Sequence, residues 1–270
     1  MSFLQAFFFG LLQGITEFFP VSSSAHLTLL KYLFNLKELN DPVFFNLTCH
    51  LGTTLSTIVF LRKEITSILF KKPKELLYFA LALFPLVILY PLLGSLIKAY
   101  SVQSRYLGFA FLVTSLLLTI AAFSKTKQTL DKKQHVRKTQ DVLFIGLMQV
   151  LALVPGLSRS GATIFAGSVR GWSLKEILTF SFLLAIPTIL GGSVIEIAHH
   201  LKVQSLAQTQ SLGSIGFSSY LTAFLTSFIV GLICIRLIFA LKYKKRLLYF
   251  AAYTFLMGIF SLIYLNNVVQ

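Results

Sequence analysis

Long apolar stretches follow one another along almost the whole sequence, and short polar segments separate them. A helix needs about 20 apolar residues to cross a bilayer. Six stretches meet this length approximately, and they predict an all-α polytopic membrane protein with about six full spans. The predicted spans are residues 43–61, 76–97, 105–123, 174–197, 217–240 and 247–265.

Two other apolar stretches are interrupted by a proline and by polar residues. Residues 3–34 are too long for one span, and Pro20 breaks the helix because proline lacks an N–H group and collides with the preceding turn. Non-helical backbone at membrane depth requires surrounding protein or a water-filled cavity, so this element is either a re-entrant pair or two tilted short spans. We expect helices over 3–18 and 22–34, and a second interrupted element with helices over 142–154 and 161–169 around a turn at 155–160.

The two halves of the sequence resemble each other. GLLQ at 10–13 recurs as GLMQ at 146–149, and at the same offset of 136 residues the serines at 22–24 align with the Ser-Arg-Ser at 158–160. Each half then consists of one interrupted pair followed by three spans. This order predicts a single membrane domain over residues 1–270, made of pseudo-repeats 1–123 and 142–270 that the basic loop 124–141 joins.

The distribution of charge agrees with a membrane protein. Charged residues make up 12% of the chain, against about 25% in soluble domains. The net charge of +15 would suggest nucleic acid as a partner of a soluble protein, but positive charge also gathers in the cytoplasmic loops of membrane proteins, so we expect no nucleic-acid partner. If the predicted spans are followed along the chain, four of the connecting loops lie on the same side of the membrane: residues 62–75, 124–141, 170–175 and 242–246. These four loops hold 17 Lys and Arg, whereas the segments on the opposite side hold five.

This charge bias places those four loops in the cytoplasm. The two interrupted elements then enter the membrane from opposite faces. Inverted repeats whose broken helices meet near the midplane are a known way to build a buried polar site. The sequence therefore predicts an inverted repeat with a site between the two breaks.

Glu17 lies inside the first interrupted element, where a carboxylate at the bilayer centre costs roughly 2.5–3.5 kcal/mol. Gln13 precedes it by one helical turn and shares its face. A buried glutamate that only fixes helix packing is the alternative interpretation. One carboxylate with one neutral amide suits Mg²⁺, which takes few protein ligands together with substrate phosphates.

Polar side chains also follow the break at Pro20. Ser22, Ser23 and Ser24 begin the next helix, where serine caps free N–H groups and the helix start attracts an anion. His26 is a candidate general base, general acid or nucleophile, and its alternative role is that of a hydrogen-bonded core histidine. His50, in a later span, is a weaker candidate for a supporting or structural role.

The second break offers a fixed cation. Arg159 stays charged and binds phosphate through two parallel N–H bonds, whereas the alternative is a side chain that snorkels to the interface. Ser158, Ser160 and Thr163 add hydroxyl groups around it. We expect this basic break to face the acidic one and to bind a phosphate group between them.

Several other residues receive simpler interpretations. We expect three residues at the membrane interface, namely Arg236, Glu196 and Trp172, the last of which lies close to Arg170. Cys49 and the second cysteine, Cys234, have neither the spacing nor the surroundings of a metal site or a disulfide. The first residues lack the basic start of a signal peptide, so we expect them to belong to the mature protein.

The segments LQGITEFFPVSSSAH and PGLSRSGATI resemble the two signature motifs of the undecaprenyl-diphosphate phosphatase family, also called bacitracin-resistance proteins. HLGT at 50–53 and FSFLLAIP at 180–187 extend the resemblance over essentially the whole chain. One departure is Ala25, where the family usually has glycine before the histidine, and this change touches no reactive group.

The resemblance implies a multi-pass enzyme of the bacterial inner membrane. Such an enzyme removes the terminal phosphate of undecaprenyl diphosphate, a C55 lipid, and returns the monophosphate carrier to cell-wall (peptidoglycan) synthesis. It also implies an inverted-repeat helical fold, dependence on a divalent cation, Mg²⁺ or Ca²⁺, and a site that opens to the outer, periplasmic side. A homodimer is among the expected assemblies, and the bilayer and the polyprenyl diphosphate are the expected partners.

We therefore expect a membrane phosphatase that binds the terminal phosphate of its lipid substrate between the two breaks. The nucleophile is either water activated by His26 or Glu17, or a side chain, Ser23 or His26 itself. The rival hypothesis is a transporter or flippase of an anionic lipid, although the serine–histidine cluster beside an acid favours the enzyme. The predicted catalytic residues are Glu17 (also the metal ligand), His26, Arg159 and Ser23, and the predicted substrate-binding residues are Gln13, Ser22, Ser24, Ser158, Ser160 and Thr163.

Overall fold

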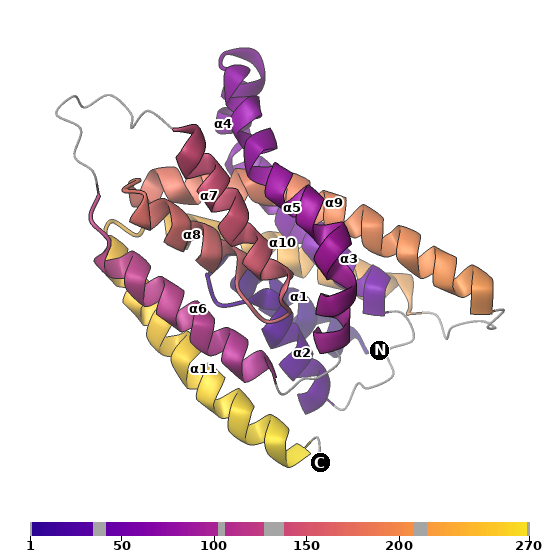
Figure 1. The fold of residues 1–270 in the computed structure, drawn as a ribbon. Coiled ribbons are helices and arrows are strands. Elements are labelled where there is room, and N and C mark those ends of the chain that lie inside the picture. The colour runs from indigo at the N-terminus through magenta and orange to yellow at the C-terminus, as the bar shows by residue number, and fades with distance from the viewer. Residues whose placement is uncertain (1, 35–41, 102–105, 127–137, 208–214, 269–270) are drawn as a thin grey trace.

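The computed structural model describes residues 2–34, 42–101, 106–126, 138–207 and 215–268, and these residues form helices joined by short turns (Figure 1). No strand occurs within these ranges. The helices are α1 (Phe3–Phe18), α2 (Ser23–Leu33), α3 (Pro42–Phe60), α4 (Arg62–Phe70), α5 (Lys74–Ser101), α6 (Tyr106–Phe123), α7 (Thr139–Val150), α8 (Arg159–Val169), α9 (Leu174–Ala207), α10 (Phe217–Phe239) and α11 (Leu247–Val268), with 3₁₀ turns η1 (Leu151–Leu153) and η2 (Lys244–Arg246).

The long helices confirm an all-α polytopic membrane protein. Five helices of the described chain are long and apolar enough to cross a membrane, and a bent pair makes a sixth candidate. The five segments are Lys74–Gly94, Tyr106–Phe123, Leu174–His200, Phe217–Phe239 and Lys244–Leu265. Many of their large apolar side chains are exposed, such as Leu77 and Leu92 on α5, which suits a surface solvated by lipid.

The sixth candidate corrects one prediction. Residues 62–75 were expected to be a basic loop, but Arg62–Phe70 form α4, which is bent by 70° against α3. Its lysine and arginine suggested a loop, yet Glu64 lies in the first helical turn, where an acid complements the helix dipole. Ile68 is buried against the core and holds the short helix in place.

The two short interrupted elements pack in related ways. Helix α1 lies along α10, and α7 lies along α5. The glycine of the repeated GLxQ motif lies at both crossings: a Cβ on Gly10 would lie 2.6 Å from the carbonyl oxygen of Ala223, and a Cβ on Gly146 would lie even closer to that of Ala82. Both crossings therefore need a residue without a side chain, as a duplicated element would.

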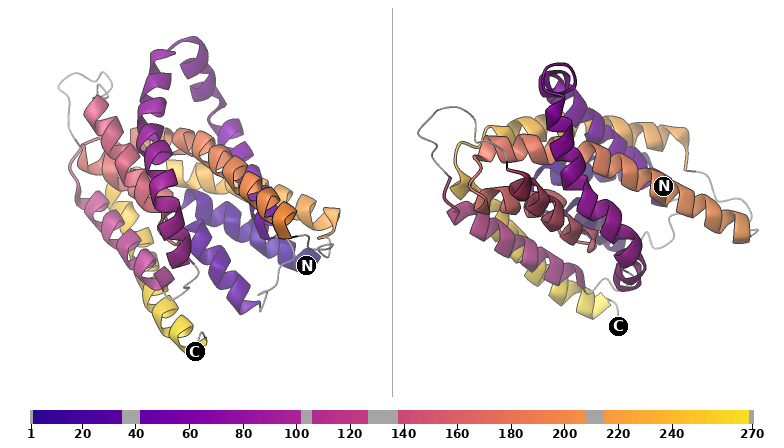
Figure 2. Two further views of the ribbon diagram at one scale, coloured as in Figure 1. Left: turned by 45° about the vertical axis from the view of Figure 1, so that its right-hand side comes forward. Right: turned by 45° about the horizontal axis from the view of Figure 1, so that its top comes forward.

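The remaining helices close the bundle around these elements. Helix α3 packs on α10 and α9, and α6 packs along α11. All views show α6 and α11 side by side at one edge of the molecule (Figures 1 and 2). At another edge, α9 extends past its neighbours in Figure 1 and in the right view of Figure 2. In the proposed repeat, α3 corresponds to α9 and α6 to α11, so the α3–α9 and α6–α11 contacts would join equivalent elements. The inverted repeat itself stays a prediction.

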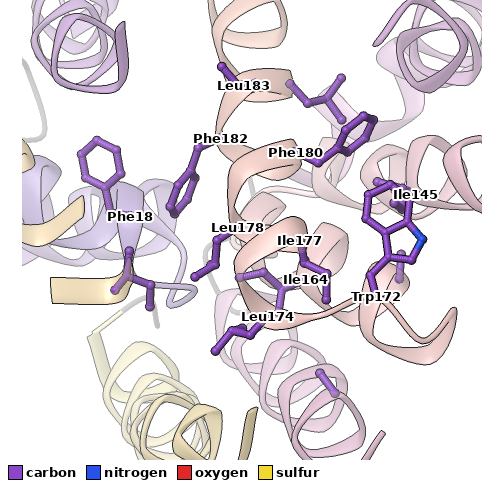
Figure 3. Close-up of a cluster of buried hydrophobic side chains, with 14 of the residues drawn as sticks. Phe18, Ile145, Ile164, Trp172, Leu174, Ile177, Leu178, Phe180, Phe182 and Leu183 are labelled. Carbon is purple, nitrogen blue, oxygen red and sulfur yellow. The ribbon is translucent and has the colours of Figure 1, made fainter. Parts of the chain in front are cut away.

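A cluster of buried apolar side chains ties the ends of α1, α7, α8 and α9 together (Figure 3). Phe18 meets Phe182 edge to face, with ring centroids 5.5 Å apart, and Trp172 meets Phe180 in the same way at 5.4 Å. Edge-to-face contacts stabilise such a cluster beyond the burial of area alone. This cluster fixes the C-terminal end of α1, and with it the position of Glu17.

Trp172 also corrects a prediction, because it is a core residue and not an interface anchor. It is 1% exposed, and its indole N–H donates to Asp141 at 3.4 Å. Asp141 also accepts from Arg170 at 2.5 Å, although the sequence placed it at the end of a polar loop. The turn at Gly171, with a φ of 89°, carries the chain back so that Trp172 points inward.

Candidate active site

The two helix breaks meet in the interior of the bundle. The first break runs from Phe19 to Ser22, between α1 and α2, and the second runs from Val154 to Ser158, between η1 and α8. The backbone N–H of Gly156 donates to Ser24 at 3.4 Å and so joins the breaks directly. Gly156 has a φ of 93°, which glycine adopts without strain.

Glu17, near the end of α1, carries the main contact between the breaks. Its Oε1 accepts from a terminal guanidinium nitrogen of Arg159 at 2.5 Å. Its Oε2 accepts from the amide of Gln13 at 3.0 Å and from the hydroxyl of Ser23 at 2.9 Å. The carboxylate is 8% exposed, so its charge is compensated by a cation and by hydrogen bonds, as a buried charge requires.

The serines of the first break occupy different positions around this carboxylate. Ser22 caps α2 by accepting from the N–H of Ala25 at 3.4 Å, and its Oγ lies 3.4 Å from that of Ser24. Within the described ranges, Ser22 is the one non-glycine residue with a positive φ, at 72°. Such a conformation is uncommon outside glycine and persists only where its surroundings hold it.

His26 supplies one such restraint. Its Nδ1 lies 2.7 Å from the carbonyl oxygen of Ser22, and its Nε2 lies 2.8 Å from the hydroxyl of Tyr253. The imidazole stacks on the Tyr253 ring and meets the edge of Phe111. Both ring nitrogens are thus engaged behind the serine turn, so the geometry favours a role in positioning the turn over direct contact with a substrate.

The second break presents Arg159 at the start of α8. Ser158 caps this helix by accepting from the N–H of Gly161 at 3.1 Å, and its hydroxyl lies 3.2 Å from that of Ser160. Thr163, one turn further, bonds to backbone carbonyls of its own helix and lies 2.7 Å from the hydroxyl of Ser181. Thr163 therefore links α8 to α9.

A cavity of about 570 Å³ opens between the two breaks. One end is polar and holds Glu17, Arg159 and the serine hydroxyls; the walls toward α5 and α9 are apolar, with Val87 and Ile195 among their residues. A small polar end with an apolar wall suits an amphipathic ligand whose head is anionic. Of the predicted residues, those that line the cavity are Glu17, Ser22, Ser23, Ser24, Ser158, Arg159 and Ser160, whereas Gln13, His26 and Thr163 do not.

The sequence profile of the family described as "Bacitracin resistance protein BacA" matches residues 6–260. The chain belongs to the bacitracin-resistance protein family. Relatives include proteins named undecaprenyl-diphosphatase from Protochlamydia amoebophila, 38% identical over 98% of this chain and 99% of the relative, and from Thermosipho melanesiensis, 36% identical over 94% and 96%. A third, of the same name, comes from Carboxydothermus hydrogenoformans and is 33% identical over 97% of both chains.

In this family member, His50 lies closer to the acid than its sequence context suggested. Its Nδ1 lies 2.9 Å from the Gln13 amide nitrogen and 3.6 Å from Glu17 Oε2, and the residue lines the cavity. Its position in the third turn of α3 placed it in a span, but no pattern in that span indicated which helix it would face.

Gln149 and Thr188 also line the cavity, and neither was predicted to be a site residue. The Gln149 side chain is buried, and its Nε2 has no hydrogen-bond partner among the described residues. Its Oε1 accepts from Thr188 at 3.5 Å. The available signal was the repeat, since Gln149 is the counterpart of Gln13 in the GLMQ segment.

Proposed function

We propose that this protein is a membrane phosphatase that converts undecaprenyl diphosphate to undecaprenyl phosphate and phosphate, and so returns the lipid carrier to peptidoglycan synthesis. The names of the relatives support this activity. The observation that carries it is the cavity itself, where Glu17, Ser23 and Arg159 surround a polar end that continues into an apolar groove. The head of the lipid diphosphate would lie at the polar end, and its polyprenyl chain along the groove.

Arg159 and the start of α8 would hold the terminal phosphate. Within the described chain, the guanidinium uses one nitrogen for Glu17, which leaves further N–H groups for phosphate oxygens. The free N–H groups of a helix start and the hydroxyls of Ser158 and Ser160 add donors on the same side. These donors would neutralise the charge that develops on the phosphoryl oxygens, which is the main task in phosphoryl transfer.

Ser23 is the nucleophile that the contacts favour. Its hydroxyl donates to Glu17 Oε2 at 2.9 Å and lines the cavity, whereas His26 does not. In the proposed step, Ser23 Oγ bonds to the terminal phosphorus, its proton passes to Glu17, and the bond from phosphorus to the bridging oxygen breaks. The lipid monophosphate leaves, and water then attacks the phosphoserine, releasing phosphate and restoring Ser23.

The donor set at Glu17 also suits a divalent cation, Mg²⁺ or Ca²⁺. The Oε1 of Gln13 is buried without a hydrogen-bond partner among the described residues, and its amide is bonded to the carboxylate. One carboxylate and one amide oxygen are the few protein ligands that Mg²⁺ takes beside substrate phosphates. When bound there, such an ion would neutralise charge on the diphosphate.

We further infer that the protein resides in the bacterial inner membrane, with the cavity open to the periplasmic side. The excess of Lys and Arg in residues 62–75, 124–141, 170–175 and 242–246 supports this orientation. A homodimer remains a proposal for the assembly in the membrane.

Phosphate release tests the activity against the transport alternative. Purified protein is incubated with a polyprenyl diphosphate, and free phosphate is measured with and without a chelator such as EDTA. We expect release that stops on chelation and returns with added Mg²⁺ or Ca²⁺. A transporter or flippase would release no phosphate under either condition, and that result would overturn the proposed function.

A further inference from the structure

A second cavity, of about 460 Å³, lies away from the first. Its walls come from the end of α3, the start of α4, the start of α9 and the last turns of α10, and it shares no lining residue with the active-site cavity. His50 borders the first cavity and Phe60 the second, so about 15 Å of α3 separate them at 1.5 Å per residue.

The second cavity is strongly positive. Arg62, Lys63, Lys175 and Arg236 line it, and Glu64 is the one acid among its lining residues. No side chain of these four cations forms an ion pair or a hydrogen bond with any described residue. Four cations around one cavity that only one acid shares favour an anionic ligand there.

The rest of the cavity wall is apolar. Val59 and Phe60 come from α3, and Leu232 and Phe239 from α10; the rings of Phe60 and Phe239 lie 5.1 Å apart. Phe60 ends the α3 half of a bent candidate span, and Phe239 ends another candidate span. The cavity therefore lies at the ends of these candidate spans, where its wall combines apolar side chains with cations.

We propose that this second cavity binds the phosphate headgroup of an anionic phospholipid, whose acyl chains lie along the apolar wall. Arginine and lysine donate charge-assisted hydrogen bonds to phosphate oxygens, and basic pockets between spans bind lipid headgroups in this way. Dissolved phosphate has the same headgroup chemistry, but it would leave the wall formed by Val59, Leu232 and the two phenylalanines uncovered. A lipid satisfies both surfaces.

Native mass spectrometry of the purified full chain, titrated with phosphatidylglycerol, tests the proposal. The cavity variant carries Arg62→Gln, Lys63→Gln, Lys175→Gln and Arg236→Gln. The matched control removes four charges elsewhere, with Lys71→Gln, Lys72→Gln, Lys242→Gln and Lys245→Gln, none of which lines the cavity. We expect the Kd for the lipid to rise at least about tenfold in the cavity variant and less than about twofold in the control.

Three results would overturn the proposal. The cavity variant could bind the lipid as tightly as the parent protein, or the control could weaken binding equally, which would assign the effect to the general positive field. Millimolar inorganic phosphate could displace the lipid completely, which would assign the cavity to a free anion. If the fourfold variant does not fold, the pair Lys63→Gln and Lys175→Gln, both at exposed positions, replaces it, with an expected rise of at least about threefold.

Discussion

Single side chains determine how the two breaks are held together. Glu17 accepts three hydrogen bonds, from Arg159, Gln13 and Ser23, and His50 lies 3.6 Å away. A carboxylate held on several sides cannot rotate freely, so the Glu17 carboxylate stays in position to accept the proton of Ser23. The same contacts make Glu17 and Arg159 dependent on each other, because a buried charge that loses its partner is strongly destabilised.

Replacing Glu17 tests its role as proton acceptor. Glu17→Gln keeps the size and much of the hydrogen bonding of the side chain but removes the negative charge, so we expect kcat to fall by roughly 10²–10⁴. Phosphate release measures kcat, and thermal unfolding checks that the variant remains folded. Glu196→Gln on α9 is the matched control, because Glu196 is exposed and lies outside the cavity lining; its kcat should not change. Near-normal kcat in Glu17→Gln would remove Glu17 from the reaction.

His26 and Tyr253 test whether the histidine positions the serine turn. His26→Gln can still donate to the Ser22 carbonyl, whereas His26→Ala cannot, and the loss of one hydrogen bond costs about 1 kcal/mol. We therefore expect His26→Ala to lower kcat about fivefold or more, with His26→Gln and Tyr253→Phe closer to the parent protein. The pH–rate profile should keep its shape in all three.

A catalytic histidine would give a different result. His26→Gln and His26→Ala would then lose activity equally, and one limb of the pH–rate profile would disappear, because no side chain at that position could exchange a proton near neutral pH.

At the scale of elements, two glycines allow the interrupted helices to approach their neighbours. Gly10 lies against the backbone of α10 at Ala223, and Gly146 lies against the backbone of α5 at Ala82. These crossings position the helices that carry Glu17 and Gln149. A side chain at either glycine would push the helix, and its end of the cavity, away from the bundle.

Alanine at these glycines should therefore destabilise the protein. Gly10→Ala and Gly146→Ala overpack a helix crossing, and we expect each to cost about 1–3 kcal/mol, seen as a lower melting temperature in detergent. Gly94→Ala is the control, since the nearest atom to its added Cβ, on Tyr90, lies at an ordinary 3.8 Å. This control should be neutral or slightly stabilising because alanine favours a helix. An unchanged melting temperature in both test variants would contradict the tight crossings.

At the scale of the whole molecule, the chain combines an amphipathic cavity with an asymmetric distribution of charge. Most Lys and Arg fall in loops that the proposed topology places on one side. That topology also determines from which leaflet the active-site cavity would receive its lipid. The orientation is therefore as important to the function as the site itself.

Cysteine labelling in intact cells tests this orientation. Cys49 and Cys234 are buried, and both are replaced by alanine before a single reporter cysteine is introduced. Lys72→Cys and Lys245→Cys should react with a membrane-impermeant maleimide only after lysis, whereas Lys202→Cys should react in the intact cell once the outer membrane, where present, is permeabilised. The opposite pattern would invert the proposed topology.

Much of the architecture follows from the sequence because span length and charge bias have direct physical causes. The α3 span, predicted over 43–61, covers Pro42–Phe60, and α10, predicted over 217–240, covers Phe217–Phe239. The contact of Glu17 with Arg159 was also expected, since a buried acid and a buried cation each need compensation. The prediction of a loop from charge composition was wrong at 62–75, because a short amphipathic helix can contain the same charged residues as a loop.

The sequence could not indicate in which direction each side chain of the breaks points. His26 does not line the cavity, because its two ring nitrogens are engaged by the Ser22 carbonyl and by the hydroxyl of Tyr253, 227 residues later. Trp172 turns inward for a comparable reason, the tight turn at Gly171. These orientations depend on tertiary contacts that no local pattern encodes.

The bond between Glu17 and Arg159 has an evolutionary consequence. The acid comes from the first half of the chain and the guanidinium from the second, and at the offset of 136 residues the position of Glu17 is taken by Leu153 and that of Arg159 by Ser23. Neither half, with its present side chains, contains both charges. If the halves arose by duplication of one gene, the ancestor must have carried the acid and the base in a single copy, or the two charges were acquired separately after the copies were fused.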